Sequence, residues 1–139
     1  MTRICKVLIV ENDSFVRNLL ADVFEREGYH FSTLETGTNM RNALDAEDYD
    51  IAVIDVTQPG SEDGFDLAQL ARERGCGTIL VTGDHRHRER LSQSAHPHLL
   101  KPFRMQELLD LAEKILIETA AQCVRRTRSD GSCFPARTE

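Results

Sequence analysis

The chain has 139 residues, of which 40% are hydrophobic and 29% are charged, and these values are typical of one ordinary globular domain. The formal net charge of −6 argues against direct binding of nucleic acid through electrostatics. No apolar run is long enough to span a membrane, and the apolar start is followed by acidic residues instead of a small-residue cleavage site, so we expect a cytoplasmic protein. The four cysteines form no CxxC pair, and we interpret them as free thiols.

Segments typical of strands and of helices alternate along the first part of the chain. Residues 6–10 (KVLIV) are a continuous apolar run, which is typical of a strand buried on both faces. A helix follows, with Ser14 as its expected cap and Gly28 as its end. Its apolar residues recur at i, i+3 and i+4, and they are Phe15, Val16, Leu19, Leu20, Val23 and Phe24. The more polar residues 30–35 predict an edge strand, and residues 38–47 predict a short amphipathic helix.

The same alternation continues in the second part of the chain. Three further strands are expected, at residues 51–55 (IAVID), 78–82 (TILVT) and 98–100 (HLL). The loop TQPGSEDG leads into a helix that stops near Gly75. Residues 84–94 are polar and weakly helical, whereas residues 105–124 predict a long helix.

Strands that alternate with helices predict an α/β domain with a doubly wound, five-stranded parallel sheet and helices on both faces. We expect this domain to occupy residues 1–124. Residues 125–139 are polar and contain Gly and Pro, so we expect them to form a flexible tail with no second domain after it.

Polar side chains stand where four of the predicted strands end. Glu11 and Asn12 follow the first strand, and Asp55 ends the third. Thr82 ends the fourth strand, and Lys101 follows the fifth. Open α/β sheets bind ligands at this edge, so these side chains are expected to converge there. Carboxylate and amide oxygens suit Mg²⁺, an Asp can accept a phosphoryl group, and a Lys and a Thr hydroxyl can contact that group. The set predicts phosphoryl transfer to Asp55.

Taken together and in order, these motifs resemble the receiver domain of two-component response regulators. The motifs are VLIVEND with Arg17, IAVIDVTQPGSEDG, VTG and LLKPF. The resemblance covers roughly residues 4 to 120. It implies a flavodoxin-like sheet with strand order 2-1-3-4-5 and a stand-alone, single-domain phosphoacceptor in a signalling relay, not an enzyme.

The resemblance also implies a role for each metal-site residue. Asp55 matches the phosphoacceptor, which takes a phosphoryl group from a sensor histidine kinase or a histidine phosphotransfer protein. Glu11 and Asn12 match the acidic pair that arranges Mg²⁺ together with Asp55 and the backbone carbonyl of Thr57. Asn12 can coordinate through its carbonyl oxygen but brings no charge, so weaker Mg²⁺ affinity is expected. Asp13 falls at the start of the helix, where it suits the macrodipole.

Three further residues match the switch that responds to phosphorylation. Thr82 matches the switch hydroxyl, and Lys101 matches the lysine that contacts the phosphoryl group. The Lys101–Pro102 bond is similar to one that is cis in the family. His98 takes the place of the aromatic residue that reports phosphorylation at the surface. The resemblance implies that the signal is a conformational change at the fourth and fifth helices.

The last helix has two apolar stripes where one would suffice to cover the sheet. The first stripe consists of Leu108, Leu111, Ala112 and Ile115. The second consists of Leu109, Leu116, Ala120 and Cys123. A helix this broadly apolar predicts a second partner surface, and we expect a homodimer through this fifth helix, with the second stripe as its candidate residues and the fourth helix as a further contact. The alternative is that the chain's own tail covers it.

Three alternative functions agree less well with the sequence. A pseudo-receiver would be a protein-interaction module that Asn12 and a longer loop have made unable to accept phosphate, but the presence of Asp55, Thr82 and Lys101 argues against it. A phosphohydrolase of the haloacid dehalogenase type requires a second Asp two residues after the first, where this chain has Thr57. A flavin binder requires a phosphate-binding loop after the first strand, and the acidic Glu-Asn-Asp sequence would repel a phosphate.

Overall fold

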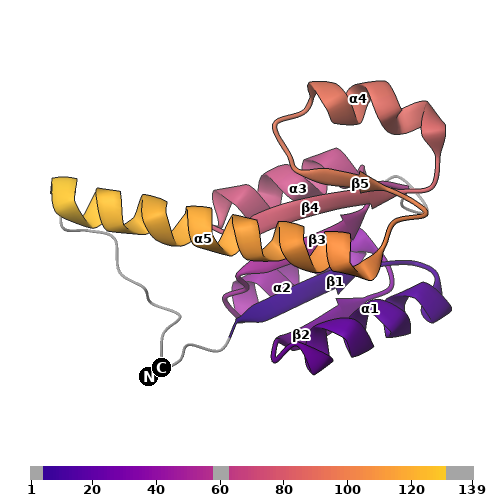
Figure 1. Ribbon diagram of the computed structural model, residues 1–139, viewed down its shortest axis with the longest axis horizontal. Coiled ribbons are helices and arrows are strands. Elements are labelled where there is room, and N and C mark those ends of the chain that lie inside the picture. Colours follow the sequence, from indigo (N-terminus) through magenta and orange to yellow (C-terminus); the bar gives the residue numbers. More distant parts are fainter. Residues whose placement is uncertain (1–4, 58–62, 131–139) are drawn as a thin grey trace.

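The computed structural model describes residues 5–57 and 63–130 of the chain, with side chains as far as residue 119. Five strands form one parallel sheet in the order β2-β1-β3-β4-β5 (Figure 1). The strands are β1 (Lys6–Val10), β2 (His30–Leu34), β3 (Ile51–Asp55), β4 (Gly77–Thr82) and β5 (His98–Leu100). The predicted flavodoxin-like topology is therefore confirmed.

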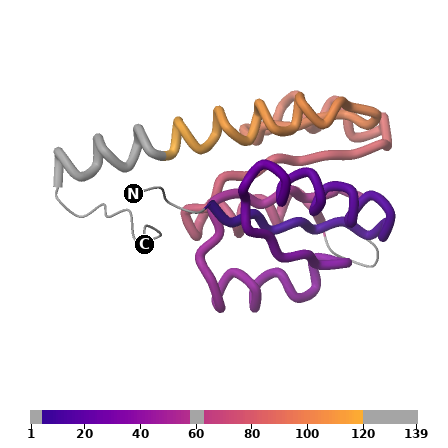
Figure 2. The backbone as a smooth tube through the Cα atoms, turned by 60° about the horizontal axis from the view of Figure 1, so that its bottom comes forward, coloured from indigo at the N-terminus to yellow at the C-terminus, as the bar shows by residue number. Residues whose placement is uncertain are grey.

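Helices cover both faces of this sheet. They are α1 (Ser14–Arg26), α2 (Met40–Ala46), α3 (Gly64–Glu73), α4 (Arg88–Gln93) and α5 (Met105–Asp130), with the short 3₁₀ helices η1 (Gly37–Asn39) and η2 (His85–His87). α1 and α5 pack on one face, whereas α2 and α3 pack on the other (Figures 1 and 2). α4 lies beside β5 at the edge of the sheet (Figure 1).

Successive residues of the central strands point into two separate hydrophobic cores, as the alternation of side chains in a strand requires. Leu8 and Val10 pack with residues of α2 and α3. Val7 and Ile9 pack with residues of α1 and α5. Every residue of β3 is buried, whereas β2 carries exposed and half-buried residues, as expected for an edge strand. Burial on both faces explains why the central strands are continuous apolar runs.

The cap of α1 differs from the prediction by one residue. Oδ1 of Asp13 accepts hydrogen bonds from the backbone N–H groups of Phe15 at 2.9 Å and Val16 at 3.2 Å. Asp13 has an extended backbone and Ser14 is already helical, so the prediction of Ser14 as the cap was wrong. Gly28 follows the end of the helix with φ of 88°, the left-handed conformation that favours glycine, as predicted.

Three other helices have different bounds from those expected. Residues 38–47 divide into η1 and α2, and residues 84–94 divide into η2 and α4, whose only buried residue is Leu91. α5 continues to Asp130, past the expected end at residue 124. The sequence permits this extension, because three of residues 125–130 are Arg, a strong helix former, and the first Gly after residue 124 is at position 131. The rest of the expected tail lies outside the described residues.

Within the described ranges, no helix combines the length and the apolarity that a membrane crossing needs. Cys5 and Cys76 are free thiols, as predicted. Cys123 and Cys133 fall outside the part of the chain whose side chains are described.

Candidate functional site

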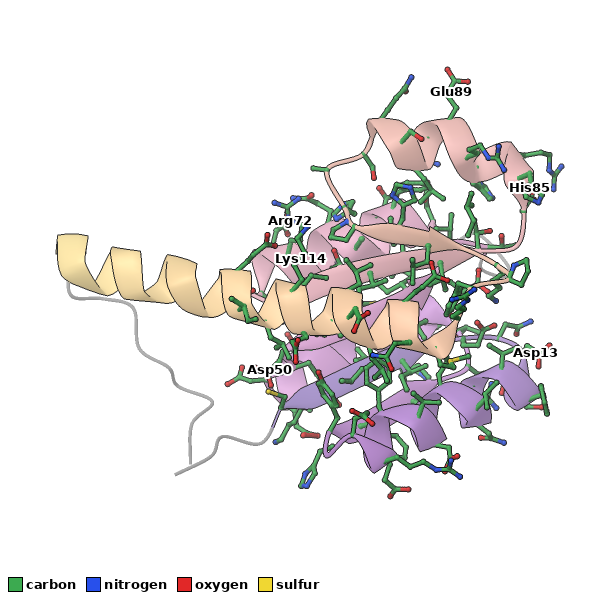
Figure 3. All side chains as sticks on the ribbon, in the orientation of Figure 1. Asp13, Asp50, Arg72, His85, Glu89 and Lys114 are labelled. Carbon is green, nitrogen blue, oxygen red and sulfur yellow. The ribbon has the colours of Figure 1, made fainter. Side chains whose placement is uncertain are left out.

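The carboxyl ends of the strands bring the predicted site residues to one edge of the sheet. Figure 3 shows Asp13, at the start of α1, at this edge, and Asp50, which precedes β3, at the opposite edge. Glu11 continues the ladder of β1, because its backbone N–H donates to the carbonyl of Leu34 at 3.0 Å. The parallel strands therefore place their carboxyl ends at the same edge of the sheet, where the side chains that follow them lie close together.

A lysine bridges two carboxylates at the centre of this edge. Nζ of Lys101 lies 3.0 Å from Oε1 of Glu11 and 3.0 Å from Oδ2 of Asp55. The Glu11 side chain is 3% exposed and that of Asp55 is 10% exposed, whereas that of Lys101 is 26% exposed. The two carboxylates are thus removed from water and share one cation, which reduces the repulsion between them.

Burial and charge shift the pKa values of this cluster. Burial raises the pKa of Glu11, and the charge of Asp55 adds to the rise, against hydrogen bonds from Asp13 and Lys101 that lower it. Burial alone would lower the pKa of Lys101, but the charges of Asp55 and Glu11 outweigh it and raise that pKa. The lysine is therefore held in its charged form, which suits it to contact an anionic group.

Both oxygens of Asp55 have defined partners. Oδ2 accepts the hydrogen bond from Lys101, and Oδ1 accepts one from the backbone N–H of Thr57 at 2.9 Å. Asp55 ends a strand that is buried throughout, so its backbone is also fixed. The carboxylate is oriented before any ligand arrives, which is favourable for a nucleophile.

The turn after β1 is held by its own hydrogen bonds. Oε2 of Glu11 accepts from the backbone N–H of Asp13 at 3.1 Å. Nη1 of Arg17 donates to the carbonyl oxygens of Glu11 at 2.9 Å and of Asn12 at 3.3 Å. Asn12 itself is exposed at the rim. The turn therefore presents the Glu11 carboxylate inward and leaves Asn12 next to solvent.

Thr82 is completely buried and lies beside Thr57. The two hydroxyl oxygens are 3.2 Å apart, and Thr82 Oγ1 also accepts from the backbone N–H of Asp84 at 3.0 Å. Lys101 is joined to the same strand, since its backbone N–H donates to the carbonyl of Thr82 at 2.8 Å. The expected cis bond between Lys101 and Pro102 is present.

His98 is not part of this cluster. It stands at the first position of β5, is half-buried, and its Nδ1 lies 3.4 Å from the carbonyl oxygen of His96. It lines a surface cavity of about 400 Å³ together with residues of α5. A role for His98 in reporting phosphorylation stays a prediction.

Of the four candidate residues for a dimer surface, the structure describes the side chains of two. Leu109 and Leu116 are partly buried and pack against the core beneath α1 and α5. Ala120 and Cys123 lie outside the residues whose side chains are described. Among the described side chains of α5, the exposed large hydrophobic residue is Ile117, at 64%. The second apolar stripe is thus partly used within the domain, and the dimer stays a prediction.

Some features of the site were not found by sequence reasoning. Phe15 and Leu19 belong to the apolar residues that recur along α1, yet they are 75% and 39% exposed. The apolar stripe of α1 is wider than the part of the helix that contacts the sheet. The spacing of the apolar residues does not show which of them make that contact. Arg90 lies in the polar segment of residues 84–94, and its spacing alone predicts no partner. Its guanidinium lies 3.9 Å from the centre of the Phe65 ring and donates to Asp63 Oδ2 at 3.0 Å.

The donors at this edge fit a hard cation such as Mg²⁺. Glu11 and Asp55 supply carboxylate oxygens, Asn12 an amide oxygen and Thr57 a backbone carbonyl, all of which are ligands that Mg²⁺ accepts. In the described ranges, no three His, Cys, Asp or Glu side chains come together as a metal site. A cation here would therefore depend on the neutral oxygens of Asn12 and Thr57 as well as on two carboxylates.

The chain matches the family model described as the response regulator receiver domain over residues 7–113. It is 29% identical over 130 residues to the TorCAD operon transcriptional regulatory protein TorR of Escherichia coli K12, covering 89% of this chain and 56% of that protein. It is 31% identical over 117 residues to the aerobic respiration control protein ArcA of the same strain, covering 81% of this chain and 49% of that protein. The chain thus spans about half the length of these curated relatives.

Solved structures agree with the family match. A CheY-like receiver domain protein from Methanospirillum hungatei superposes with a TM-score of 0.75 at 23% identity, covering 86% of this chain and 98% of that one. The response regulator TrrA of Thermotoga maritima, in complex with Mg²⁺ and BeF, gives a TM-score of 0.73 at 28% identity and covers 81% of this chain and 100% of that one. The chain belongs to the response regulator receiver domain family.

Proposed function

We propose that this receiver domain is phosphorylated in a two-component phosphorelay, with Asp55 as the phosphoacceptor. The donor is a sensor histidine kinase or a histidine phosphotransfer protein, and the protein acts in the cytoplasm. The observation that carries the proposal is the contact of Lys101 Nζ with both Asp55 and Glu11, at 3.0 Å each. It combines a buried carboxylate nucleophile with a cation suited to the incoming phosphoryl oxygens.

The chemistry follows from the positions of these groups. An oxygen of Asp55 forms a bond to phosphorus while the bond from phosphorus to the donor's imidazole nitrogen breaks, and the imidazole leaves with the electron pair. The ammonium group of Lys101 stabilises the charge on the transferring group. Glu11, Asn12, Asp55 and the Thr57 carbonyl are the proposed Mg²⁺ ligands, and bound Mg²⁺ supplies further positive charge.

The signal is proposed to pass through Thr82 to the loop before α4. Thr82 Oγ1 accepts from the backbone N–H of Asp84 and lies 3.2 Å from the Thr57 hydroxyl, so movement of this hydroxyl toward a phosphoryl group would change both contacts. α4 is short and has one buried residue, Leu91, which makes it a suitable element to move. α5 is the second proposed output surface, with His98 beside it.

A protein donor needs a surface next to Asp55 on which to dock. Phe15 and Leu19 are exposed and one turn apart on α1, the helix that begins at the site. Exposed apolar pairs of this kind favour a protein partner over solvent. We propose that this pair contacts the phosphodonor protein.

The homodimer through α5 is retained as part of the proposal. Its support is the exposure of Ile117, because a large aliphatic side chain that is 64% exposed on a long helix favours a partner. Direct binding of nucleic acid is not expected at a net charge of −6. Sedimentation that shows a monomer at high protein concentration, with and without phosphorylation, would remove the dimer from the proposal.

The test of phosphorylation is a measurement of intact mass. The purified chain is incubated with acetyl phosphate and Mg²⁺, and the expected product carries one phosphoryl group. The adduct should be absent in Asp55→Asn, which keeps the shape of the side chain but lacks the nucleophilic carboxylate. A wild-type chain that gains no phosphoryl group and binds no Mg²⁺ would instead favour the pseudo-receiver, a module that acts only by binding other proteins.

A further inference from the structure

Arg17 reaches back from α1 to the turn that carries two of the proposed metal ligands. Its Nη1 donates to the backbone carbonyl of Glu11 at 2.9 Å and to that of Asn12 at 3.3 Å. Its own backbone N–H donates to the carbonyl of Asp13 at 2.8 Å. A single side chain therefore joins the first turns of the helix to the two residues that follow β1.

The contacts of Arg17 hold the backbone just beyond the last hydrogen bond that β1 makes in the sheet. The ladder of β1 ends with the N–H of Glu11 on the carbonyl of Leu34, and the helix is capped from Asp13. Glu11 and Asn12 lie between these two regular elements. Backbone carbonyls in such a turn need donors, and Arg17 supplies one to each of them. Arg17 therefore helps to hold the direction of both peptide carbonyls, alongside the other hydrogen bonds of Glu11.

We propose that Arg17 is a positioning residue for the Mg²⁺ site, which orients the turn so that the Glu11 carboxylate and the Asn12 amide converge on a cation. This inference rests on the proposed function, because it concerns the same metal. Asn12 brings no charge, so its contribution to binding depends on where its oxygen points. Residues that orient metal ligands commonly matter almost as much as the ligands themselves.

The direction in which Mg²⁺ affinity changes when Arg17 is replaced distinguishes a positioning role from a purely electrostatic one. Arginine remains positively charged at all working pH values, and a positive charge near the site repels Mg²⁺. If charge alone mattered, loss of Arg17 would tighten Mg²⁺ binding. If Arg17 orients the ligands, its loss weakens binding in spite of the removed repulsion.

The experiment is a Mg²⁺ titration of the unphosphorylated chain, followed by amide chemical shifts or calorimetry, on the wild type and three variants. Arg17→Met removes the donors and the charge, whereas Arg17→Lys keeps the charge but loses the planar fork. Arg26→Met is the matched control, because Arg26 stands on the same helix and pairs with Asp22 at the exposed surface. We expect Arg17→Met to raise the Kd for Mg²⁺ about tenfold and Arg17→Lys to raise it less, with Arg26→Met within about twofold of the wild type.

A second measurement distinguishes positioning from damage to the fold. The rate of phosphorylation of Arg17→Met by acetyl phosphate should return toward the wild-type rate at saturating Mg²⁺, which a disrupted domain would not do. If circular dichroism shows Arg17→Met to be unfolded, Arg17→Lys decides the question by the same titration. If Arg17→Met and Arg17→Lys bind Mg²⁺ as tightly as the wild type or more tightly, the positioning role of Arg17 is overturned but the proposed function is not. A wild-type chain that binds no Mg²⁺ overturns the proposed function and this inference together.

Discussion

The hydroxyl oxygens of Thr57 and Thr82 lie 3.2 Å apart, so the proposed switch residue has a partner before any phosphoryl group arrives. Thr57 lies two residues after the end of β3, and Thr82 ends the neighbouring strand β4. Thr82 is completely buried, whereas Thr57 is exposed. The contact therefore joins the rim of the site to its interior.

We expect Thr57→Val to prolong the lifetime of the phosphoryl adduct. The substitution removes the competing hydroxyl, so Thr82 can donate to the phosphoryl group without first losing a hydrogen bond, which is worth about 1 kcal/mol. The lifetime is measured by intact mass after removal of the phosphodonor. Thr57→Ser keeps a hydroxyl and is the control. Equal lifetimes in all three proteins would show that the contact does not restrain Thr82.

Lys101→Met should slow phosphorylation by acetyl phosphate by about a hundredfold, because the developing charge on the phosphoryl oxygens loses its nearest cation. It should also lower the free energy of unfolding, since Glu11 and Asp55 would remain buried without the cation that they share. The control is Lys114→Met, because Lys114 lies on α5 away from the site (Figure 3). A rate within a few-fold of the wild type would exclude Lys101 from the transfer step.

Phe15→Ser should slow phosphorylation by a histidine phosphotransfer protein at least about tenfold and leave phosphorylation by acetyl phosphate unchanged. The reason is that an exposed aromatic side chain at an interface typically contributes more than 1 kcal/mol to binding but has no contact with a small donor. Phe31→Ser, on the edge strand β2, is a control of the same chemistry at a residue that is 37% exposed. If both donors slow equally, Phe15 acts on the site and not on docking.

Arg90→Met should loosen α4 with little effect on the rest of the domain. Arg90 connects α4 to the start of α3 by stacking on Phe65 and by an ion pair with Asp63, and that pair helps to hold the pKa of Asp63 low. The expected result is faster amide hydrogen exchange in α4 and a loss of at most about 1 kcal/mol in global stability. Arg88→Met, at an exposed position of the same helix, is the control. Unchanged exchange in α4 would show that Leu91 alone holds it.

The edge of the sheet was predictable because parallel strands bring their carboxyl ends together. Buried strands at residues 6–10 and 51–55 predict that Glu11 and Asp55 share one end of the sheet, and the strand order implied by the resemblance to receiver domains places them side by side, with Lys101 after the fifth strand. Contacts that depend on side-chain rotamers were not predictable in this way. No periodic pattern in the sequence indicates the contact between the Thr57 and Thr82 hydroxyls. The same holds for the two hydrogen bonds from Arg17 to the turn after β1.

The presence of each helix was predicted better than the exposure of its residues and the positions of its ends. Hydrophobic periodicity groups Phe15 and Leu19 with the buried residues of α1, because it shows which residues share a face but not how much of that face the sheet can cover. The end of α5 was set too early, because the Arg-rich sequence was interpreted by its polarity and not by its helix propensity. The cap of α1 was displaced by one residue, since Asp13 and Ser14 are both good capping residues.

His96 should make the domain less stable as the pH falls below 6.5. Burial lowers the pKa of this histidine, with a smaller contribution from the charge of Arg72, and its Nδ1 lies 3.1 Å from the hydroxyl of Thr78. The folded state therefore favours neutral His96, whereas the unfolded chain takes up a proton near the ordinary pKa of 6.5. The stability that neutral His96 provides is complete above that pH, and it is lost as the pH falls from 6.5 toward the lower pKa of the folded state.

The measurement is urea unfolding of the wild type and His96→Gln at pH 7.5 and pH 5.5. The wild type should lose more free energy of unfolding between these two pH values than the variant does, because glutamine takes up no proton. His30→Gln provides the control, since it makes the same substitution at an exposed position of the edge strand β2. If His96→Gln shows the same loss as the wild type, the acid sensitivity of the domain belongs to other groups, and the bond to Thr78 does not select the neutral form of His96.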